Sequence, residues 1–189
     1  LPDEIRQGHA TGADMTIDPD GEHNWGFTAK ATPLHTDMPV PRGKITGGTS
    51  AINGQVYLRA IPEDFDYWVG EGNDEWSFEK VLPFLKNLEN DLDLTNRYHG
   101  NDGPILVRRY QLDELVDDQA AFIRAATTAG FSRTDDHNHP ASSGVGPLPL
   151  NNPDGVRWST AIGYLTMARD RQNFTISPDS HTTRILFND

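Results

Sequence analysis

Hydrophobic residues recur at helical spacing in three stretches of the chain. In residues 77–90 the valine and leucine positions share one face, which predicts a helix that Pro83 kinks or restarts. Residues 114–129 show the same spacing and predict the most regular helix, with Gly130 as its stop. Residues 160–170 predict a third helix with apolar side chains on one side.

Strand signals are shorter and lie elsewhere. Residues 103–109 predict a strand entered through a Gly-Pro turn, and residues 173–177 and 182–187 predict two more. Residues 132–155 are rich in proline, glycine, asparagine and aspartate, and predict a loop. Residues 1–41 have few periodic apolar positions, so we expect them to wrap over something else. The pattern predicts a chain of mixed α and β structure.

The net charge of the chain excludes one class of binding partner. The chain has 16 basic and 28 acidic residues, a formal net charge of −12. A surface this acidic repels phosphate backbones, so we expect no nucleic-acid partner.

No stretch approaches the roughly 18 apolar residues of a membrane helix, so we expect no membrane span. No signal-peptide pattern is visible, and a cytoplasmic location is the working expectation. The absence of cysteine excludes thiol catalysis and thiolate metal sites.

The strongest chemical signal is the glycine-rich segment, residues 42–60. Gly43, Gly47, Gly48 and Gly54 remove side chains where the backbone must approach something closely. Short hydrogen-bonding side chains stand among them, at Thr49, Ser50 and Asn53. Such a segment can bind an anionic or carbonyl-rich ligand, although a tight turn between two elements explains the spacing equally well. It matches neither the phosphate-binding P-loop nor the G-x-S-x-G nucleophile elbow.

Further motifs follow in a fixed order along the chain. They are Gly43-Lys44, Gly47-Gly48, Thr49-Ser50 and Ile52-Asn53, then Asp64-Phe65-Asp66-Tyr67-Trp68, Val81-Leu82-Pro83-Phe84, Glu89, His99-Gly100, Gly103-Pro104, Arg157-Trp158-Ser159 and Arg184-Ile185-Leu186-Phe187. In this order they resemble the glucose-methanol-choline (GMC) family of flavin-dependent oxidoreductases. The family's amino-terminal G-x-G-x-x-G motif and its carboxy-terminal catalytic histidine are not in this sequence. The chain therefore looks like an internal fragment.

The resemblance implies a mixed α/β architecture: part of a Rossmann-like FAD-binding domain plus part of the GMC substrate-binding domain. Residues 1–110 would belong to the FAD-binding domain and carry the flavin-contacting glycine-rich segment. Residues 111–158 would begin the substrate domain or connect to it, and residues 159–189 would return to the FAD-binding domain.

The resemblance also implies the cofactor and its contacts. By motif position, the residues expected at FAD are Gly43, Gly48, Thr49, Asn53, Gly54, Val56 and Thr182. Thr182 would reach the adenine through its backbone. Some members attach FAD through a histidine where this chain has Ile52, and because an alkyl side chain cannot form that bond, we expect non-covalent FAD.

The implied reaction is oxidation of a small-molecule alcohol to a carbonyl, with hydride passing to flavin N5. The base would be the absent histidine, so the catalytic residue is unknown within this chain and the remaining segments of the same enzyme are its expected partners. The fragment alone would be inactive. Two alternatives stay open: a cofactor-free binding or structural module derived from the same fold, and a lyase acting on cyanohydrins.

Three histidines could suggest a metal site or a catalytic role. His137 and His139 with Asp135 and Asp136 suggest a metal site, but ligands so close along one loop rarely converge, so we expect a solvated loop and no metal. His99 reads as structural rather than catalytic.

Overall fold

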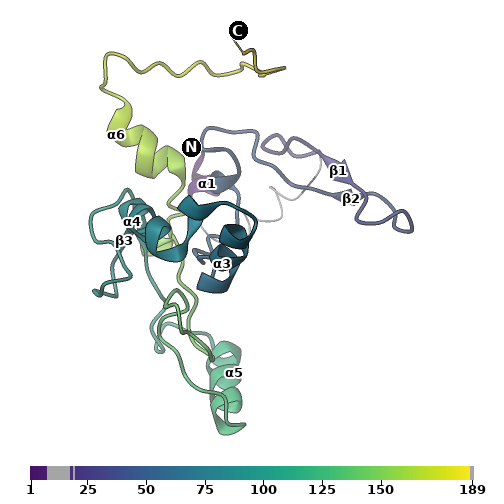
Figure 1. The fold of residues 1–189 in the computed structure, drawn as a ribbon. Coiled ribbons are helices and arrows are strands. Elements are labelled where there is room, and N and C mark those ends of the chain that lie inside the picture. The colour runs from purple at the N-terminus through teal and green to yellow at the C-terminus, as the bar shows by residue number, and fades with distance from the viewer. Residues whose placement is uncertain (8–17, 19, 188–189) are drawn as a thin grey trace.

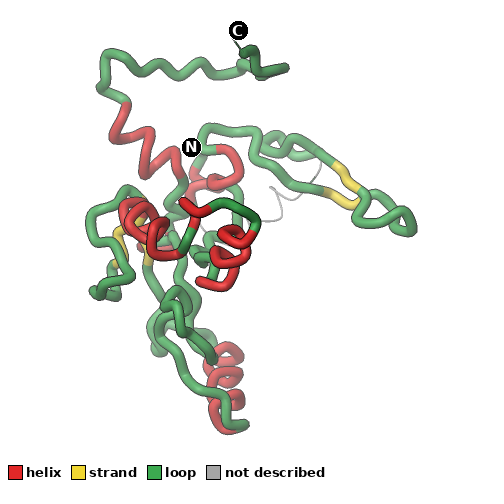
Figure 2. The backbone as a smooth tube through the Cα atoms, viewed as in Figure 1, coloured by secondary structure: helices red, strands yellow, loops and turns green. Residues whose placement is uncertain are grey.

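The computed structural model describes residues 1–7, 18 and 20–187. Its α-helices are α1 (Asp3–Arg6), α3 (Pro62–Gly70), α4 (Phe78–Leu88), α5 (Asp117–Thr128) and α6 (Thr166–Ala168). Its strands are β1 (Thr28–Ala29), β2 (Met38–Pro39), β3 (Glu89–Asp91) and β4 (Ile105–Val107). Short helical turns complete the described elements: η1 (Gly48–Ala51), η2 (Asp74–Trp76), η3 (Pro153–Gly155) and the π-helical η4 (Ala161–Leu165). Loops join them over long stretches (Figure 2).

A central body and three projecting segments make up the molecule (Figure 1). Helices α1, α3 and α4 lie in the body with β3. The antiparallel β1–β2 hairpin extends to one side, α5 extends to the end opposite the tail, and the chain after α6 runs as an extended tail. Among the described residues, no helix combines the length and the apolarity that crossing a membrane requires.

The apolar core lies between α3 and α4. Phe65 of α3 and Phe78 and Leu82 of α4 are buried and pack as one cluster. The helix predicted over residues 77–90 is confirmed as α4, with Pro83 inside it. Because α4 ends at Leu88, directly before Glu89, the helix fixes where β3 begins.

A small sheet follows this core. β3 pairs in parallel with β4, with Glu89 opposite Ile105 and Asp91 opposite Val107. Leu150 then bridges Arg108 on one side and Val56 on the other. The end of the glycine-rich segment is therefore the outermost strand-like segment of this sheet.

Most of the predicted elements are present. The helix predicted over residues 114–129 is confirmed as α5, and Gly130 follows it with a left-handed φ of 96°. The helix predicted over residues 160–170 is confirmed over η4 and α6, with a π-helical first part that periodicity did not indicate. The strand predicted over residues 103–109 is confirmed as β4.

Three predictions need correction. Residues 173–177 and 182–187 form no strand within the described part of the chain, because strand composition gives no ladder without a neighbouring segment to pair with. Residues 1–41, where few periodic apolar positions gave no expected helix or strand, include α1 and the β1–β2 hairpin. Helix α3 was missed, although Pro62 at its first position and the Asp64 carboxylate on the Ile61 amide (3.1 Å) are helix-start features.

Candidate functional site

The glycine-rich segment forms a tight loop that a distant part of the chain holds in place. Gly47 and Gly48 adopt left-handed φ values of 95° and 55°, and Gly48 begins η1. The Ser50 hydroxyl donates to the Gly47 carbonyl (2.7 Å) and accepts from the Thr160 amide (3.0 Å). Arg157 donates to the carbonyls of Asn53 (3.1 Å) and Ala51 (3.2 Å).

One side of this loop is closed by its own backbone. A Cβ added at Gly43 would lie 2.3 Å from the Gly48 carbonyl oxygen, so the absence of a side chain at Gly43 lets the loop close on itself. The Gly43 amide donates to the Thr49 hydroxyl (3.3 Å), and its carbonyl accepts from the Trp25 indole (3.1 Å). The internal packing explains this glycine without a ligand.

The other side is open. A Cβ at Gly48 or Gly54 would meet no atom of the described chain within 4 Å, and Thr49 and Val56 are exposed. The bridge to Leu150 is made by the Tyr57 amide (2.9 Å to the Pro149 carbonyl) and by the Gln55 carbonyl. In such an antiparallel pair the intervening residue directs its own amide and carbonyl to the opposite side. Val56 therefore presents an edge of backbone to solvent.

Asn53 and Thr182 complete the residues expected at FAD. The Asn53 side chain accepts from the Gln55 amide (3.1 Å), so it shapes the turn before Val56. Thr182 lies exposed in the tail, next to His181, whose ring packs edge-on against Trp25 at 5.1 Å. Since Trp25 also holds the Gly43 carbonyl, the structure brings this part of the tail to the closed side of the glycine-rich segment.

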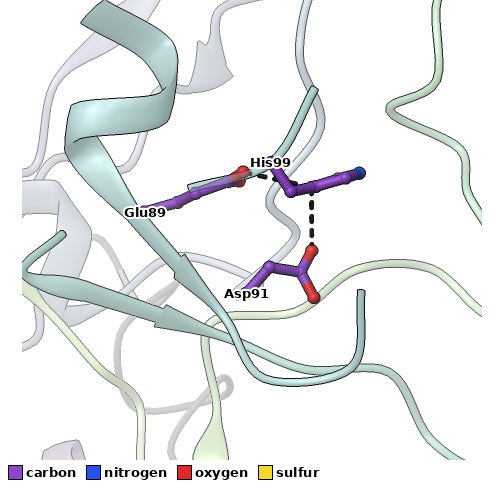
Figure 3. A group of neighbouring side chains, drawn as sticks. All are labelled: Glu89, Asp91 and His99. Carbon is purple, nitrogen blue, oxygen red and sulfur yellow. Dashed lines mark hydrogen bonds and ion pairs between the residues drawn. The ribbon is translucent and has the colours of Figure 1, made fainter. Parts of the chain in front are cut away.

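Ionisable side chains are buried beside the sheet, centred on His99 (Figure 3). We call this group the charge cluster: Arg59, Glu89, Asp91, His99, Arg109 and Asp136. Glu89 and Asp91 alternate along β3, so both face the same way, and His99 reaches them from the loop after β3. His99 Nδ1 lies 3.0 Å from Glu89 Oε1 and 3.0 Å from Asp91 Oδ2, and its Nε2 lies 3.0 Å from Asp136 Oδ2.

Two arginines complete the charge cluster. Arg59, at the end of the glycine-rich segment, pairs with Glu89 and donates to the Tyr98 carbonyl (2.6 Å). Arg109 Nη1 donates to both oxygens of Asp91, at 2.9 Å to each. All of these charged side chains except Asp136 are at most 4% exposed, and Asp136 is 16% exposed.

The geometry fixes the protonation state of His99. An ionised carboxylate only accepts hydrogen bonds, and both ring nitrogens face carboxylate oxygens, so both must carry a proton. Burial alone would lower the pKa of His99, but the hydrogen bonds with Asp91, Glu89 and Asp136 raise the pKa to about 10. Burial alone would likewise raise the pKa of Asp91, and the contacts with His99 and Arg109 instead lower it to about 2. Within the charge cluster, one imidazole and two guanidinium groups face three carboxyl groups, and Asp93 contacts Arg109 from outside the cluster at 3.7 Å.

The charges of the cluster also affect whether it could bind a metal ion. Glu89, Asp91 and His99 bring one possible ligand atom each within 4.8 Å of one another. A metal would need the unprotonated nitrogen of His99 and would stand close to the two arginines, so the cluster is better suited to the proton it holds. The absence of a metal from this protein stays a prediction.

The histidine-containing loop behaves differently from the expectation of a solvated loop. His137 Nε2 lies 3.1 Å from the Gly146 carbonyl, and His139 Nδ1 accepts from the Ala141 amide (3.1 Å). Asp135 pairs with Arg133, whereas Asp136 turns toward His99. The four side chains diverge, and the solvated-loop expectation was wrong for Asp136, which joins the buried cluster.

Sequence reasoning missed most of the charge cluster. Glu89 and His99 were noticed only as motif positions, and His99 as structural. The signal that could have found the cluster was the Glu-x-Asp spacing of β3, which puts two carboxylates on one face of a strand that follows a helix.

Comparisons with known proteins show which family this chain is similar to. The family model described as GMC oxidoreductase matches residues 24–189. An uncharacterised GMC-type oxidoreductase of Rhodococcus erythropolis is 38% identical over 173 residues, 92% of this chain and 34% of the relative. An oxygen-dependent choline dehydrogenase of Brucella melitensis biotype 1 is 38% identical over 153 residues, 80% of this chain and 28% of the relative.

Solved structures show the same fold. Pyridoxine 4-oxidase from Mesorbium loti superposes with a TM-score of 0.81 at 28% identity, over 93% of this chain and 34% of that protein. The formate oxidase of Aspergillus oryzae RIB40, at 22% identity and a TM-score of 0.78, supports the fold alone; the match covers 98% of this chain and 33% of that protein.

The chain belongs to the GMC oxidoreductase family. The resemblance read from the motifs is confirmed, and so is the mixed α/β fold class. The chain spans about a third of the length of these relatives.

Proposed function

We propose that the full-length protein oxidises the hydroxyl group of a small-molecule alcohol with FAD, and that this chain supplies part of the FAD site. Family membership implies FAD, and relatives named choline dehydrogenase and pyridoxine 4-oxidase support a substrate with a hydroxyl group. FAD, when bound, would accept the hydride at N5 as the carbonyl forms. The choice of alcohol and the catalytic base would reside in segments outside this chain.

The observation that carries the proposal is the open side of the glycine-rich segment. Gly54 has no neighbour within 4 Å of its missing Cβ, and Val56 turns its backbone amide and carbonyl away from the sheet. A flat ring with carbonyl and N–H groups fits such an edge, because the backbone can both donate and accept there. Gly48 and Thr49 lie on the same open loop, where the missing side chain of Gly48 and the short exposed side chain of Thr49 leave room for the pyrophosphate.

The same geometry supports non-covalent binding. Ile52, which stands at the position of covalent attachment in some members, is buried and offers only alkyl carbon. We expect denaturation of the holoenzyme followed by ultrafiltration to release all of its flavin into the filtrate.

The domain division is part of the proposal. Residues 1–110 and 159–189 would belong to the FAD-binding domain, and residues 111–158 would begin the substrate domain. The described residues of the first two ranges lie in the central body, the β1–β2 hairpin and the tail, whereas α5 projects from the body within the third (Figure 1). The remaining segments of the same polypeptide would cover the apolar side chains that α5 exposes.

The test uses the purified full-length protein and its visible absorption spectrum. Flavin bands in the blue and near-ultraviolet support the proposal, whereas a protein that is colourless and takes up no added FAD supports the cofactor-free module instead. Gly54→Val should weaken FAD binding roughly tenfold or more, because the new side chain would stand between the backbone edge and the ring.

Gly70→Val is the matched control. Gly70 ends α3, and its missing Cβ likewise meets nothing within 4 Å, but it lies outside the glycine-rich segment. Equal FAD affinity in the two variants would mean that the flavin does not lie against Gly54.

A further inference from the structure

The charge cluster and the glycine-rich segment are joined through one buried amide side chain. The Asn138 side chain is 6% exposed; its oxygen accepts from the Arg59 amide (2.9 Å) and its nitrogen donates to the Tyr57 carbonyl (3.0 Å). Asn138 thereby holds both ends of the stretch 57–59. That stretch begins one residue after Val56, the residue that presents the open backbone edge.

Asn138 is itself held by the charge cluster. Its backbone amide donates to Asp136 Oδ1 (2.9 Å), and the other oxygen of that carboxylate contacts His99 Nε2. The Arg59 guanidinium returns to the cluster through Glu89, which contacts His99 Nδ1. The contacts therefore form a closed ring: His99, Asp136, Asn138, Arg59, Glu89 and back to His99.

A closed ring of this kind transmits a change in one member to the others. Each carboxylate in it contacts both His99 and a group on another segment, so the charge on His99 sets the position of both Asp136 and Glu89. The pairing of Tyr57 with Pro149 fixes only one edge of the stretch 57–59, and Asn138 and Arg59 fix the rest.

We propose that His99 is a positioning residue for the cofactor, which holds the backbone edge at Gly54–Val56 through the ring of contacts that runs by way of Asp136 and Asn138. The inference rests on the proposed function, since it assigns the ring a role in holding the edge on which FAD lies. His99 itself makes no contact with the cofactor in this arrangement. The groups that face it are Glu89 and Asp91 from β3, Asp136 from the loop after α5, and, one contact further out, Arg59 and Arg109.

The decisive experiment compares two neighbouring aspartates in the full-length protein. Asp136→Asn removes the carboxylate that joins His99 to Asn138, and Asp135→Asn makes the same chemical change on a side chain that is 71% exposed and pairs only with Arg133. FAD is titrated into deflavinated protein, with flavin fluorescence and visible circular dichroism as readouts. We expect at least about a tenfold rise in Kd for Asp136→Asn, with an altered visible dichroism, and wild-type values for Asp135→Asn.

Asn138→Ala is the second variant, because it leaves every charge of the cluster in place and removes only the link to Tyr57 and Arg59. It should weaken FAD binding by a similar factor. Folded Asp136→Asn or Asn138→Ala protein with wild-type Kd and dichroism would overturn the inference.

A measurement on the wild-type protein needs no variant to fold. FAD binding should slow amide hydrogen exchange at residues 136–138 and 99–100 as well as at 54–57, because the ring couples them. Protection that stops at 54–57 would also overturn the inference. Wild-type protein that binds no FAD at all would instead refute the proposed function, so the two failures are distinguishable.

Discussion

The sheet region and the helix α5 region distribute polar and apolar side chains in opposite ways. Around β3 and β4, charged side chains are buried: Glu89 is fully buried and Arg109 is 4% exposed. On α5 and just after it, large apolar side chains face solvent, with Phe122 67% and Phe131 66% exposed. The usual order of a folded protein, apolar inside and charged outside, is inverted in both places.

The difference separates a region whose buried charges are paired within the described chain from a region whose apolar face that chain leaves uncovered. In the sheet region the buried charges find their partners within the described chain, and a buried charge without a partner would be costly. The α5 face lines an apolar hollow of about 940 Å³ that nothing in the described chain fills. A chain that spans about a third of its relatives is expected to contain both kinds of region.

The largest expected loss of stability comes from breaking a buried ion pair in the sheet region. Arg109→Met keeps a side chain of similar length but leaves Asp91 without its arginine partner, and removing one partner of a buried ion pair costs about 3–5 kcal/mol. The free energy of unfolding, measured by urea denaturation, should fall by that amount. Arg133→Met removes an exposed partner of Asp135 and should cost under about 1 kcal/mol. Equal losses would show that burial does not distinguish the two pairs.

The next effect is a dependence of stability on pH. The folded-state pKa of His99, about 10, lies above its ordinary value of 6.5, so its stabilising charge is fully present below pH 6.5 and is lost as pH rises through 10. The melting temperature of wild-type protein should fall across this window. His99→Gln should be less stable at pH 6 and should lack this part of the decline.

Tyr57 accounts for a separate window at higher pH. Burial, reinforced by the charge of Glu89, raises the pKa of Tyr57 from 10 to about 12, so its contribution is lost only above pH 10. A His99→Gln variant that retained the whole decline between pH 6.5 and 10 would contradict the assignment of that window to His99.

Amphipathic periodicity predicted the helices that have a clear apolar face, α4 and α5, and Gly130 marked the end of α5. It failed where structure depends on a neighbour. Residues 182–187 have the composition of a strand but no pairing segment in the described chain, so they stay extended. Helix α3 was missed because its start is signalled by Pro62 rather than by spacing.

For the site, the motifs located the glycine-rich segment but not the reason for each glycine. Gly43 proved to serve the closure of the loop, a contact between residues that only the folded chain brings together. The charge cluster could not be predicted from composition, because an acidic residue such as Asp136 reads as a surface residue until tertiary structure places it against His99.

The smallest expected loss of stability comes from truncating an exposed apolar side chain of α5. Phe122→Ser in the 189-residue chain should change the free energy of unfolding by less than about 0.5 kcal/mol, since the side chain is 67% exposed and loses little packing. The same substitution in the full-length protein should cost about 3 kcal/mol if the remaining polypeptide buries this face, which is the usual cost of truncating a buried aromatic side chain. Urea denaturation of both forms measures the two values. Ala121→Ser, on an exposed position of the same helix, is the control for the effect of serine on helix stability and should be nearly neutral in both. A small loss in both forms would mean that the α5 face stays open in the complete protein, and the hollow beside it would then not be an internal surface of that protein.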